Sequence, residues 1–243
     1  MTHILDRPVW GALTTRHASL AEGGDLARRY QPSIVPFAAA RDDSEESLQA
    51  LGALAWPDES LLIVQADAIV LPPGFAAVTA GFGVQMILRR TVAKVSDERI
   101  ERLTDADAAD MLALATLTKP GPFSLRAQSL GEFFGVKVDG RLVAMAGERM
   151  KQDGLTEISG VCAHPDFQRR GLGRLLSMFM AHRVLERGER PYLHAYATNS
   201  AAIRLYESIG FELRTMMNVA LIRTEASTDL RTGRASLTQP ASS

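Results

Sequence analysis

The sequence contains one cysteine, Cys162, among 243 residues. A single thiol cannot form an intramolecular disulfide, and no group of cysteine and histidine residues has the spacing of a metal site. We therefore expect a protein of a reducing compartment, the cytoplasm, with no bound metal.

Long hydrophobic runs and an excess of one charge are also lacking. No stretch reaches the ~18 consecutive apolar residues of a membrane-spanning helix, and Met1 to Trp10 has no apolar segment behind a basic start, as a secretory signal has. The 27 lysine and arginine residues are balanced by 28 acidic residues. These absences argue against export, a membrane partner and a nucleic-acid partner.

Apolar residues are plentiful, at 46% of the chain, and allow one large domain or two smaller ones. Residues 1–94 are predicted to form a mixed α/β module of their own. Its expected elements are a loosely helical stretch from Trp10 to Tyr30, a helix capped by Ser44, a strand at Ser60–Gln65 and an extended segment at Phe75–Arg90. We find no chemical motif in this module.

Residues 95–224 follow a different order of elements. A helix is predicted from about Asp105 to Leu117, followed by a three-stranded antiparallel meander whose turns are Asp139-Gly140 and Asp153-Gly154. The expected strands and helices of this part cover residues 133–138, 141–150, 155–163, 171–187, 192–197, 200–209 and 211–222. This order predicts an α+β fold, with a mixed, mainly antiparallel sheet flanked by helices. Residues 225–243, rich in Ser, Thr and Ala, are predicted to be a disordered tail.

The segment from Gln168 to Arg174 connects a predicted strand to a predicted helix. The start of a helix presents unpaired N–H groups and a positive dipole end, which together bind phosphate. Gly171 and Gly173 let the backbone approach an anion closely, and arginines on both sides of Gly171 add positive charge. The spacing does not fit a dinucleotide fingerprint or a P-loop. The ligand implied is a multiply phosphorylated nucleotide carrier.

Two longer segments carry a family resemblance. Val161–Gly173 resembles the coenzyme A signature of the GNAT superfamily, Q/R-x-x-G-x-G/A after a strand that ends near His-Pro. Asn199–Phe211 resembles the second signature, N-x-x-A-x-x-L-Y-x-x-x-G-F. The resemblance covers about Ser96 to Arg223 and implies a GNAT acetyltransferase domain at 95–224. It is most similar to the glycine N-acyltransferase-like branch, in which a GNAT domain follows a diverged, degenerate GNAT-like N-terminal half.

The resemblance implies direct transfer of an acetyl group from acetyl-CoA to an amine, without an acyl-enzyme. Cys162 is then not a nucleophile but a small buried residue. Asn199 would contact the cofactor arm and also cap the last helix. The cofactor-binding residues implied by the resemblance are Val161, Cys162, Ala163, Gln168, Arg169, Arg170, Gly171, Leu172, Gly173, Arg174, Asn199, Ala202 and Tyr206.

Three residues are candidates for proton transfer. Tyr206 matches the family tyrosine, which implies that it protonates the departing thiolate. Glu157 lies eleven residues before Gln168, where histone-type members carry a glutamate base. His194 lies five residues before Asn199, where some N-terminal acetyltransferases carry one, and imidazole exchanges protons near neutral pH. Glu157 and His194 could each instead have a purely structural role on its strand. Which of the two is the base stays open.

The acceptor cannot be identified from these residues. By analogy with the branch, we expect a small amine or amino acid. Acetylation of a protein N-terminus or lysine is one alternative, and a non-catalytic CoA-binding regulatory module is another. Residues 1–94 have no comparable phosphate loop, so one cofactor site per chain is expected, while monomer and homodimer are equally open.

Overall fold

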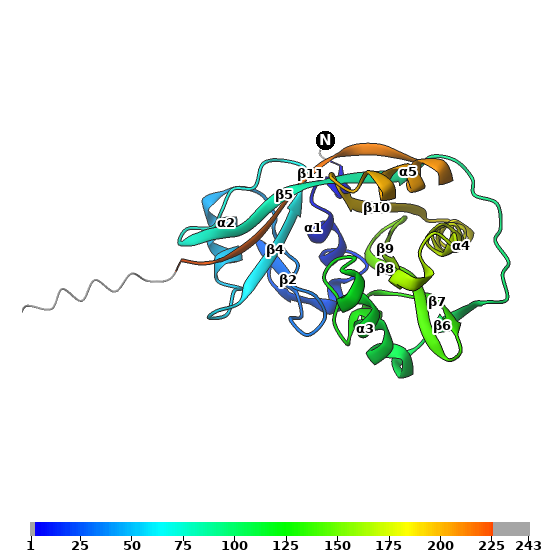
Figure 1. Cartoon of the computed structure of the whole chain (residues 1–243). Coiled ribbons are helices and arrows are strands. Elements are labelled where there is room, and N and C mark those ends of the chain that lie inside the picture. Colours follow the sequence, from blue (N-terminus) through cyan, green and yellow to red (C-terminus); the bar gives the residue numbers. More distant parts are fainter. Residues whose placement is uncertain (1–2, 226–243) are drawn as a thin grey trace, which may run out of the picture.

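The computed structural model describes residues 3–225 (Figure 1). One eight-stranded sheet runs through them in the order β4-β11-β5-β10-β9-β8-β7-β6. Neighbouring strands are antiparallel except β9 and β10, which are parallel. The predicted mixed, mainly antiparallel sheet with flanking helices is therefore confirmed. The predicted tail lies, from residue 226 on, outside the described residues.

The second part of the chain forms most of this sheet. Its strands are β6 (Ile100–Leu103), β7 (Phe133–Val138), β8 (Arg141–Gln152), β9 (Leu155–Ala163), β10 (Arg190–Tyr196) and β11 (Phe211–Thr224). Its helices are α3 (Ala108–Thr118), α4 (Leu172–Glu186) and α5 (Ser200–Ile209), with short 3-10 turns η3 (Asp105–Asp107), η4 (Ala127–Leu130) and η5 (Pro165–Phe167). Asp139 and Gly140 have φ of 51° and 78°, as the predicted type I′ turn between β7 and β8 requires.

The first part of the chain contributes two strands to the same sheet. They are β4 (Ser60–Gln65) and β5 (Phe75–Leu88), and β5 lies between β10 and β11. Its other elements are η1 (Ile4–Asp6), α1 (Pro8–Leu13), η2 (Ala18–Leu20), α2 (Glu45–Gly52) and a separate three-stranded sheet of β1 (Ala21–Gly23), β2 (Ala27–Tyr30) and β3 (Ala38–Ala40). The division of the chain at residue 94 stays a prediction, and the large sheet includes strands from both sides of it.

The helical stretch predicted from Trp10 to Tyr30 is wrong beyond α1. Ala27 to Tyr30 form β2, which pairs with β1 on one side and β3 on the other. Ala27 and Tyr30 are buried in this arrangement, at 2% and 0% exposure. The pairing of three short strands thus overrides a weak helical periodicity.

The two faces of the sheet are covered by different parts of the chain. Leu193 of β10 packs in a cluster with Leu176 and Met180 of α4. Its neighbour Tyr192 points to the other face, in a cluster with Leu5 and Leu13 from the N-terminal segment. The N-terminal segment therefore covers the face opposite α4 and α5. No helix between residues 3 and 225 has the length and apolarity needed to cross a bilayer.

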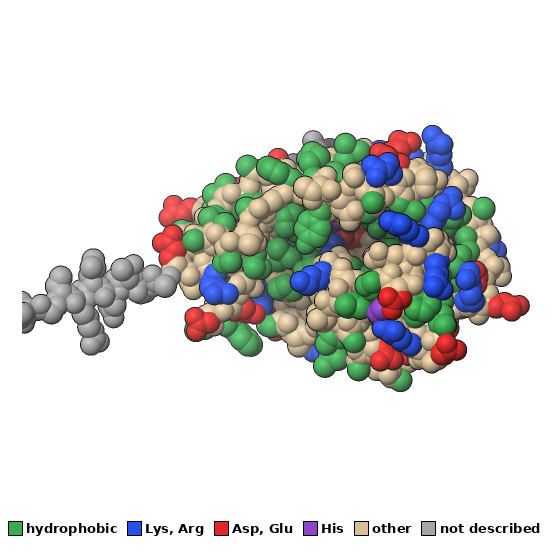
Figure 2. Space-filling view, in the orientation of Figure 1, with side chains coloured by type: hydrophobic (Ala, Val, Ile, Leu, Met, Phe, Trp, Pro, Cys, Tyr) green, Lys and Arg blue, Asp and Glu red, His purple; other side chains and the backbone are tan. Residues whose placement is uncertain are grey.

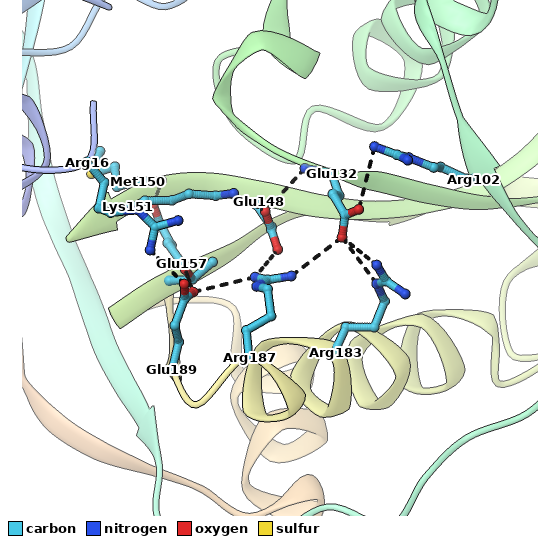
Figure 3. Close-up of polar contacts among 11 residues, drawn as sticks. Arg16, Arg102, Glu132, Glu148, Met150, Lys151, Glu157, Arg183, Arg187 and Glu189 are labelled. Atoms are coloured by element: carbon cyan, nitrogen blue, oxygen red, sulfur yellow. Dashed lines mark hydrogen bonds and ion pairs between the residues drawn. The ribbon is translucent and has the colours of Figure 1, made fainter. Parts of the chain in front are cut away.

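Ion pairs fix the end of α4 on β8 (Figure 3). Arg187 donates to Glu148, whose side chain is fully buried, at a distance of 2.5 Å. Arg183, one turn earlier, donates to Glu132 at 2.7 Å. Lys151 also pairs with Glu148, at 2.5 Å. Figure 3 shows both arginines pointing from the helix toward these carboxylates, so charge as well as apolar packing sets the position of α4.

Candidate active site

The parallel strands β9 and β10 separate halfway along their length. They pair only as far as Ile158 and Leu193. Beyond that point β10 follows β5 as far as Tyr196, while β9 stays with β8 as far as Ala163. Gly160, at φ 65°, lies in the bulge where the pairing of β9 with β8 shifts register, and such a bulge bends its strand.

This separation exposes the backbone edge that the sequence singled out. Val161, Cys162 and Ala163 follow the last residue of β9 that pairs with β10, so in residues 3–225 no strand covers their edge on that side. A strand edge of this kind can pair with an extended amide chain. The geometry therefore fits the pantetheine arm that the resemblance implies.

The predicted phosphate loop leads directly into α4. Gly171 is the N-cap residue at φ 76°, and no atom lies within 4 Å of the place where a Cβ would stand. The side chains of Arg169, Arg170 and Arg174 are exposed, whereas Leu172 packs in the core. Figure 2 shows positive side chains gathered over the region of α4 and α5. The residues present fit a phosphorylated carrier, with Leu172 able to contribute only its backbone.

The start of α4 is held against the other cofactor elements. A Cβ on Gly173 would lie 3.9 Å from Leu205 of α5 and 4.0 Å from Val161 of β9. Asn199 caps α5, since its side chain accepts a hydrogen bond from the Ala202 N–H at 3.1 Å. The predicted cofactor residues of β9, α4 and α5 therefore converge on the diverging end of the sheet.

Tyr206 and Cys162 are both buried, in different hydrophobic clusters of the core. Burial, reinforced by Cys162, raises the pKa of the Tyr206 hydroxyl to about 12, so this group keeps its proton at neutral pH. Burial raises the pKa of the Cys162 thiol to about 11, although contacts with Thr118 and Met145 act in the opposite direction. A neutral thiol is a poor nucleophile, which agrees with the expectation that Cys162 does not react.

Glu157 is fully buried and receives four hydrogen bonds. Arg149 donates to it through Nε at 2.9 Å and through Nη2 at 2.5 Å. The Met150 N–H lies 3.3 Å from Oε2, and His194 Nδ1 lies 2.7 Å from Oε1. A carboxylate has about four acceptor positions, so none is left for a substrate. Burial alone would raise the pKa of Glu157, but the charge of Arg149 and the hydrogen bonds from Arg149 and His194 lower it to about 2.

The structure thus places the two candidate bases in direct contact. His194 in turn meets Gln85 of β5, with 2.9 Å between its Nε2 and the amide Nε2. Gln85 also contacts Arg214 of β11, and Arg214 Nη2 donates to Asp6 at 2.6 Å. We did not anticipate Gln85, Arg214 or Asp6 from the sequence, because they lie in no motif and meet only through the fold.

Arg149 was also missed, although the sequence held a signal for it. The Asp153-Gly154 turn pairs Gln152 with Leu155 and Lys151 with Thr156. Continuing that register brings Glu157 opposite Met150, next to Arg149, and a register shift between Glu148 and Lys151 then brings Arg149 itself beside Glu157. Because a buried carboxylate needs a positively charged partner, Glu157 on β9 predicts a cationic side chain on β8 close to Met150.

A cavity of about 90 Å³ lies beside the diverging end of β10. Its walls are mainly apolar and come from Phe37, β4, β11 and the loop of residues 120–122. Arg149 and His194 are among its few polar groups. The Arg149 guanidinium stacks over Phe37 with 4.9 Å from Cζ to the ring centre, and Nη1 has no hydrogen-bond partner within residues 3–225. Figure 2 shows a hollow near the middle of this face, bordered by hydrophobic side chains.

A sheet that opens between two parallel strands, beside an arginine-rich helix start and a mainly apolar cavity, is the architecture of a CoA-dependent acetyltransferase. The FR47-like family model matches residues 134–219. A crystal structure of a protein from Novosphingobium aromaticivorans DSM 12444, assigned to the GNAT family of acetyltransferases, is 38% identical. The alignment covers 93% of this chain and 100% of that one, with a TM-score of 0.87. The chain belongs to the GNAT family, whose members use acetyl-CoA.

Curated relatives match over shorter lengths. The [ribosomal protein bS18]-alanine N-acetyltransferase of Salmonella typhimurium is 40% identical over 79 residues, which are 32% of this chain and 53% of that protein. The mycothiol acetyltransferase of Thermomonospora curvata is 36% identical over 74 residues, which are 30% of this chain and 25% of that protein. The chain therefore spans about half the length of the first relative and a quarter of the second.

Proposed function

We propose that the chain transfers the acetyl group of acetyl-CoA to the amine of a small acceptor whose apolar part fills the cavity beside β10. The observation that carries this proposal is the position of the cavity. It is bounded by the end of β10 that diverges from β9, so an amine in it would face the edge of β9. Nearness of the two reacting groups is itself a large part of such catalysis.

The cofactor residues each have a separate task in this proposal. Acetyl-CoA supplies an acetyl thioester, which an amine attacks directly with release of the CoA thiol. The backbone of Val161 to Ala163 would align the thioester arm, and one N–H there would polarise its carbonyl. Gln168 to Arg174 would hold the phosphates at the start of α4. Tyr206, still protonated at neutral pH, would protonate the departing sulfur.

The acceptor amine must be neutral to attack. The cavity is mainly apolar, and the positive charge of Arg149 is balanced by Glu157. No uncompensated negative charge is therefore provided for an ammonium, whose burial would be costly. We propose that the acceptor gives up its proton to water on entry. Because Glu157 has no free acceptor position, its proposed task is to orient His194 and Arg149.

The unpaired Nη1 of Arg149 points to the acceptor's chemistry. An oxygen atom near the amine, such as that of an amide or carboxylate, would complete its hydrogen bonding. An α-amino amide or amino acid with an apolar side chain has these groups. This acceptor agrees with the glycine N-acyltransferase-like branch, which stays a prediction, as does a cytoplasmic location.

Acetylation of a protein, at its N-terminus or at a lysine, is the second candidate, because one matched relative is named a [ribosomal protein bS18]-alanine N-acetyltransferase. A peptide N-terminus also bears an amide oxygen next to its amine. A non-catalytic CoA-binding module is a third candidate, and it predicts no thiol release at all.

The test is CoA thiol release from acetyl-CoA with matched acceptors. Expressed per neutral amine, we expect the kcat/KM of leucinamide to be at least tenfold above that of 3-methylbutylamine, which lacks only the amide. A peptide that begins with leucine tests the protein acceptor, and a higher kcat/KM for this peptide than for leucinamide would favour the second candidate.

Val219→Phe should raise the KM for leucinamide and leave the KM for acetyl-CoA unchanged. Binding of acetyl-CoA without release for any amine would overturn the proposed function.

A further inference from the structure

The Gln85 side chain connects four separate segments beneath the acceptor cavity. It is fully buried on β5. Its Nε2 lies 3.0 Å from the Leu5 carbonyl and 2.9 Å from His194 Nε2. Its Oε1 accepts from Arg214 Nε, and Arg214 Nη2 donates to Asp6 at 2.6 Å. The chain of contacts therefore runs from η1 through β11 and β5 to β10.

The partners of Gln85 fix which way its amide points. A guanidinium has only donors, so the atom that faces Arg214 must be the amide oxygen. A backbone carbonyl only accepts, so the atom that faces Leu5 must be the NH2 group. A flipped amide would place donor against donor and acceptor against acceptor. Both contacts thus select the same orientation, and in that orientation the NH2 group also faces His194.

The amide orientation in turn decides where His194 carries its proton. Because an N–H of Gln85 points at Nε2, that nitrogen must be the acceptor. The ring proton then lies on Nδ1 and is donated to Glu157 Oε1 at 2.7 Å. An imidazolium would place a second N–H against the Gln85 NH2 group. We propose that Gln85, oriented by Arg214 and Asp6, is a positioning residue that holds His194 as the neutral Nδ1–H tautomer.

The charged groups around the His194 ring do not by themselves fix its charge state, so the contact with Gln85 is needed. The ionised Glu157 attracts a positive charge on His194, and Asp6 lies further along the same chain of contacts. Arg149 and Arg214 repel such a charge, and Tyr192 contributes a neutral ring edge, with 5.7 Å between ring centres. Gln85 is the group that contacts Nε2 directly. Gln85 thereby keeps His194, a polar residue that lines the acceptor cavity, in one orientation and one charge state.

The tautomer can be read directly by NMR of the 15N-labelled full chain, with the His194 signals assigned by their loss in His194→Gln. At pH 7 we expect a protonated Nδ1 and an unprotonated Nε2. A protonated Nε2, or an imidazolium, in the unmodified protein would overturn the proposal. This measurement needs no substrate, so its result is independent of the proposed function.

Gln85→Glu is the matched variant, because a carboxylate of the same shape still accepts from Arg214 but now also accepts from Nε2–H. We expect His194 to become an imidazolium at pH 7 in this variant. Gln65→Glu, the same change on β4 at a residue whose Nε2 donates to the Ala68 carbonyl at 3.0 Å, is the control. Unchanged His194 signals in folded Gln85→Glu would contradict the proposal.

A kinetic test of the same variant rests on the proposed function. Gln85→Glu should lose about tenfold in kcat/KM at pH 7, with the KM for acetyl-CoA unchanged. If Gln85→Glu does not fold, Arg214→Gln serves instead. It frees the Gln85 amide to flip, so the Nε2–H tautomer should appear in its spectrum, and a spectrum that stays Nδ1–H would count against the role of Arg214.

Discussion

Tyr206 lies on α5 with its ring against Phe211, and burial raises the pKa of its hydroxyl to about 12. Such a group keeps its proton until a strong base, such as a departing thiolate, forms beside it. Tyr206→Phe removes only the hydroxyl, so we expect kcat to fall more than tenfold while the Kd for acetyl-CoA changes little. Thiol-release kinetics and a calorimetric titration give the two quantities. An unchanged kcat would remove Tyr206 from the mechanism.

Glu157 makes stability depend on acid pH. Its pKa falls from the ordinary 4.5 to about 2 in the folded chain. A depressed pKa contributes stability above 4.5, and this contribution disappears as the pH falls through 4.5 toward 2. The shift corresponds to about 3 kcal/mol. The urea-unfolding free energy of Glu157→Gln should therefore change less between pH 5 and pH 3 than that of the unmodified chain, and equal pH dependences would contradict this origin.

Several single elements could be predicted because their signals are local. The strands at Ser60–Gln65, Phe133–Val138 and Leu155–Ala163 and the helix at Ser200–Ile209 have the predicted bounds. Each is delimited by a turn or a cap within a few residues, such as Asn199 before α5. The insertion of β5 between β10 and β11 has no such local signal, since it joins residues more than a hundred positions apart.

The candidate site likewise contains residues that could be located from the sequence and residues that could not. The phosphate loop and Tyr206 belong to contiguous motifs and could be located in the sequence. The partners of Glu157 and His194 come from β8, β5 and β11, and Asp6 comes from η1. The register of the β8–β9 hairpin pointed only to the neighbourhood of one of them, Arg149, which reaches Glu157 through a register shift. Gln85 became visible through the three-dimensional pairing of Gln85 with His194.

The junction between α4 and β8 depends on a buried carboxylate. Glu148 is fully buried, and Arg187, whose side chain is 32% exposed, donates to it. Arg187→Ala removes one of its donors but leaves Lys151, so we expect a loss of about 1–2 kcal/mol in the unfolding free energy. Arg204→Ala, on the exposed face of α5, is the control and should change stability by less than about 0.5 kcal/mol. Equal urea midpoints for the two variants would show that the ion pair contributes nothing.

The whole molecule combines two parts of the chain around one site. The acceptor cavity takes walls from Phe37 and β4 as well as from β10 and β11. The positioning chain also crosses from η1 and β5 to β10 and β11. Both parts of the chain therefore line the proposed acceptor cavity, whereas the residues proposed to hold the cofactor all lie in residues 95–224.

The arrangement that we propose for cofactor binding occurs once in residues 3–225, because β9 and β10 are the one pair of parallel strands there and diverge beside one arginine-rich helix start. The first part has a six-residue helix, α1, and an eight-residue helix, α2, and the start of α2 carries Glu45 and Glu46, which would repel phosphate. A calorimetric titration should therefore give one acetyl-CoA per chain.

Charge at the two helix starts provides the matched variants for that titration. Arg170→Glu should weaken binding at least tenfold, because an arginine–phosphate contact is replaced by repulsion. Glu46→Ala at the start of α2 should leave the affinity and the stoichiometry unchanged. Two equivalents per chain, one of them lost in a variant of α2, would reveal a second phosphate-binding end and show that the two parts are functional duplicates. A single equivalent that survives Arg170→Glu at full affinity would instead mean that the start of α4 does not hold the phosphates.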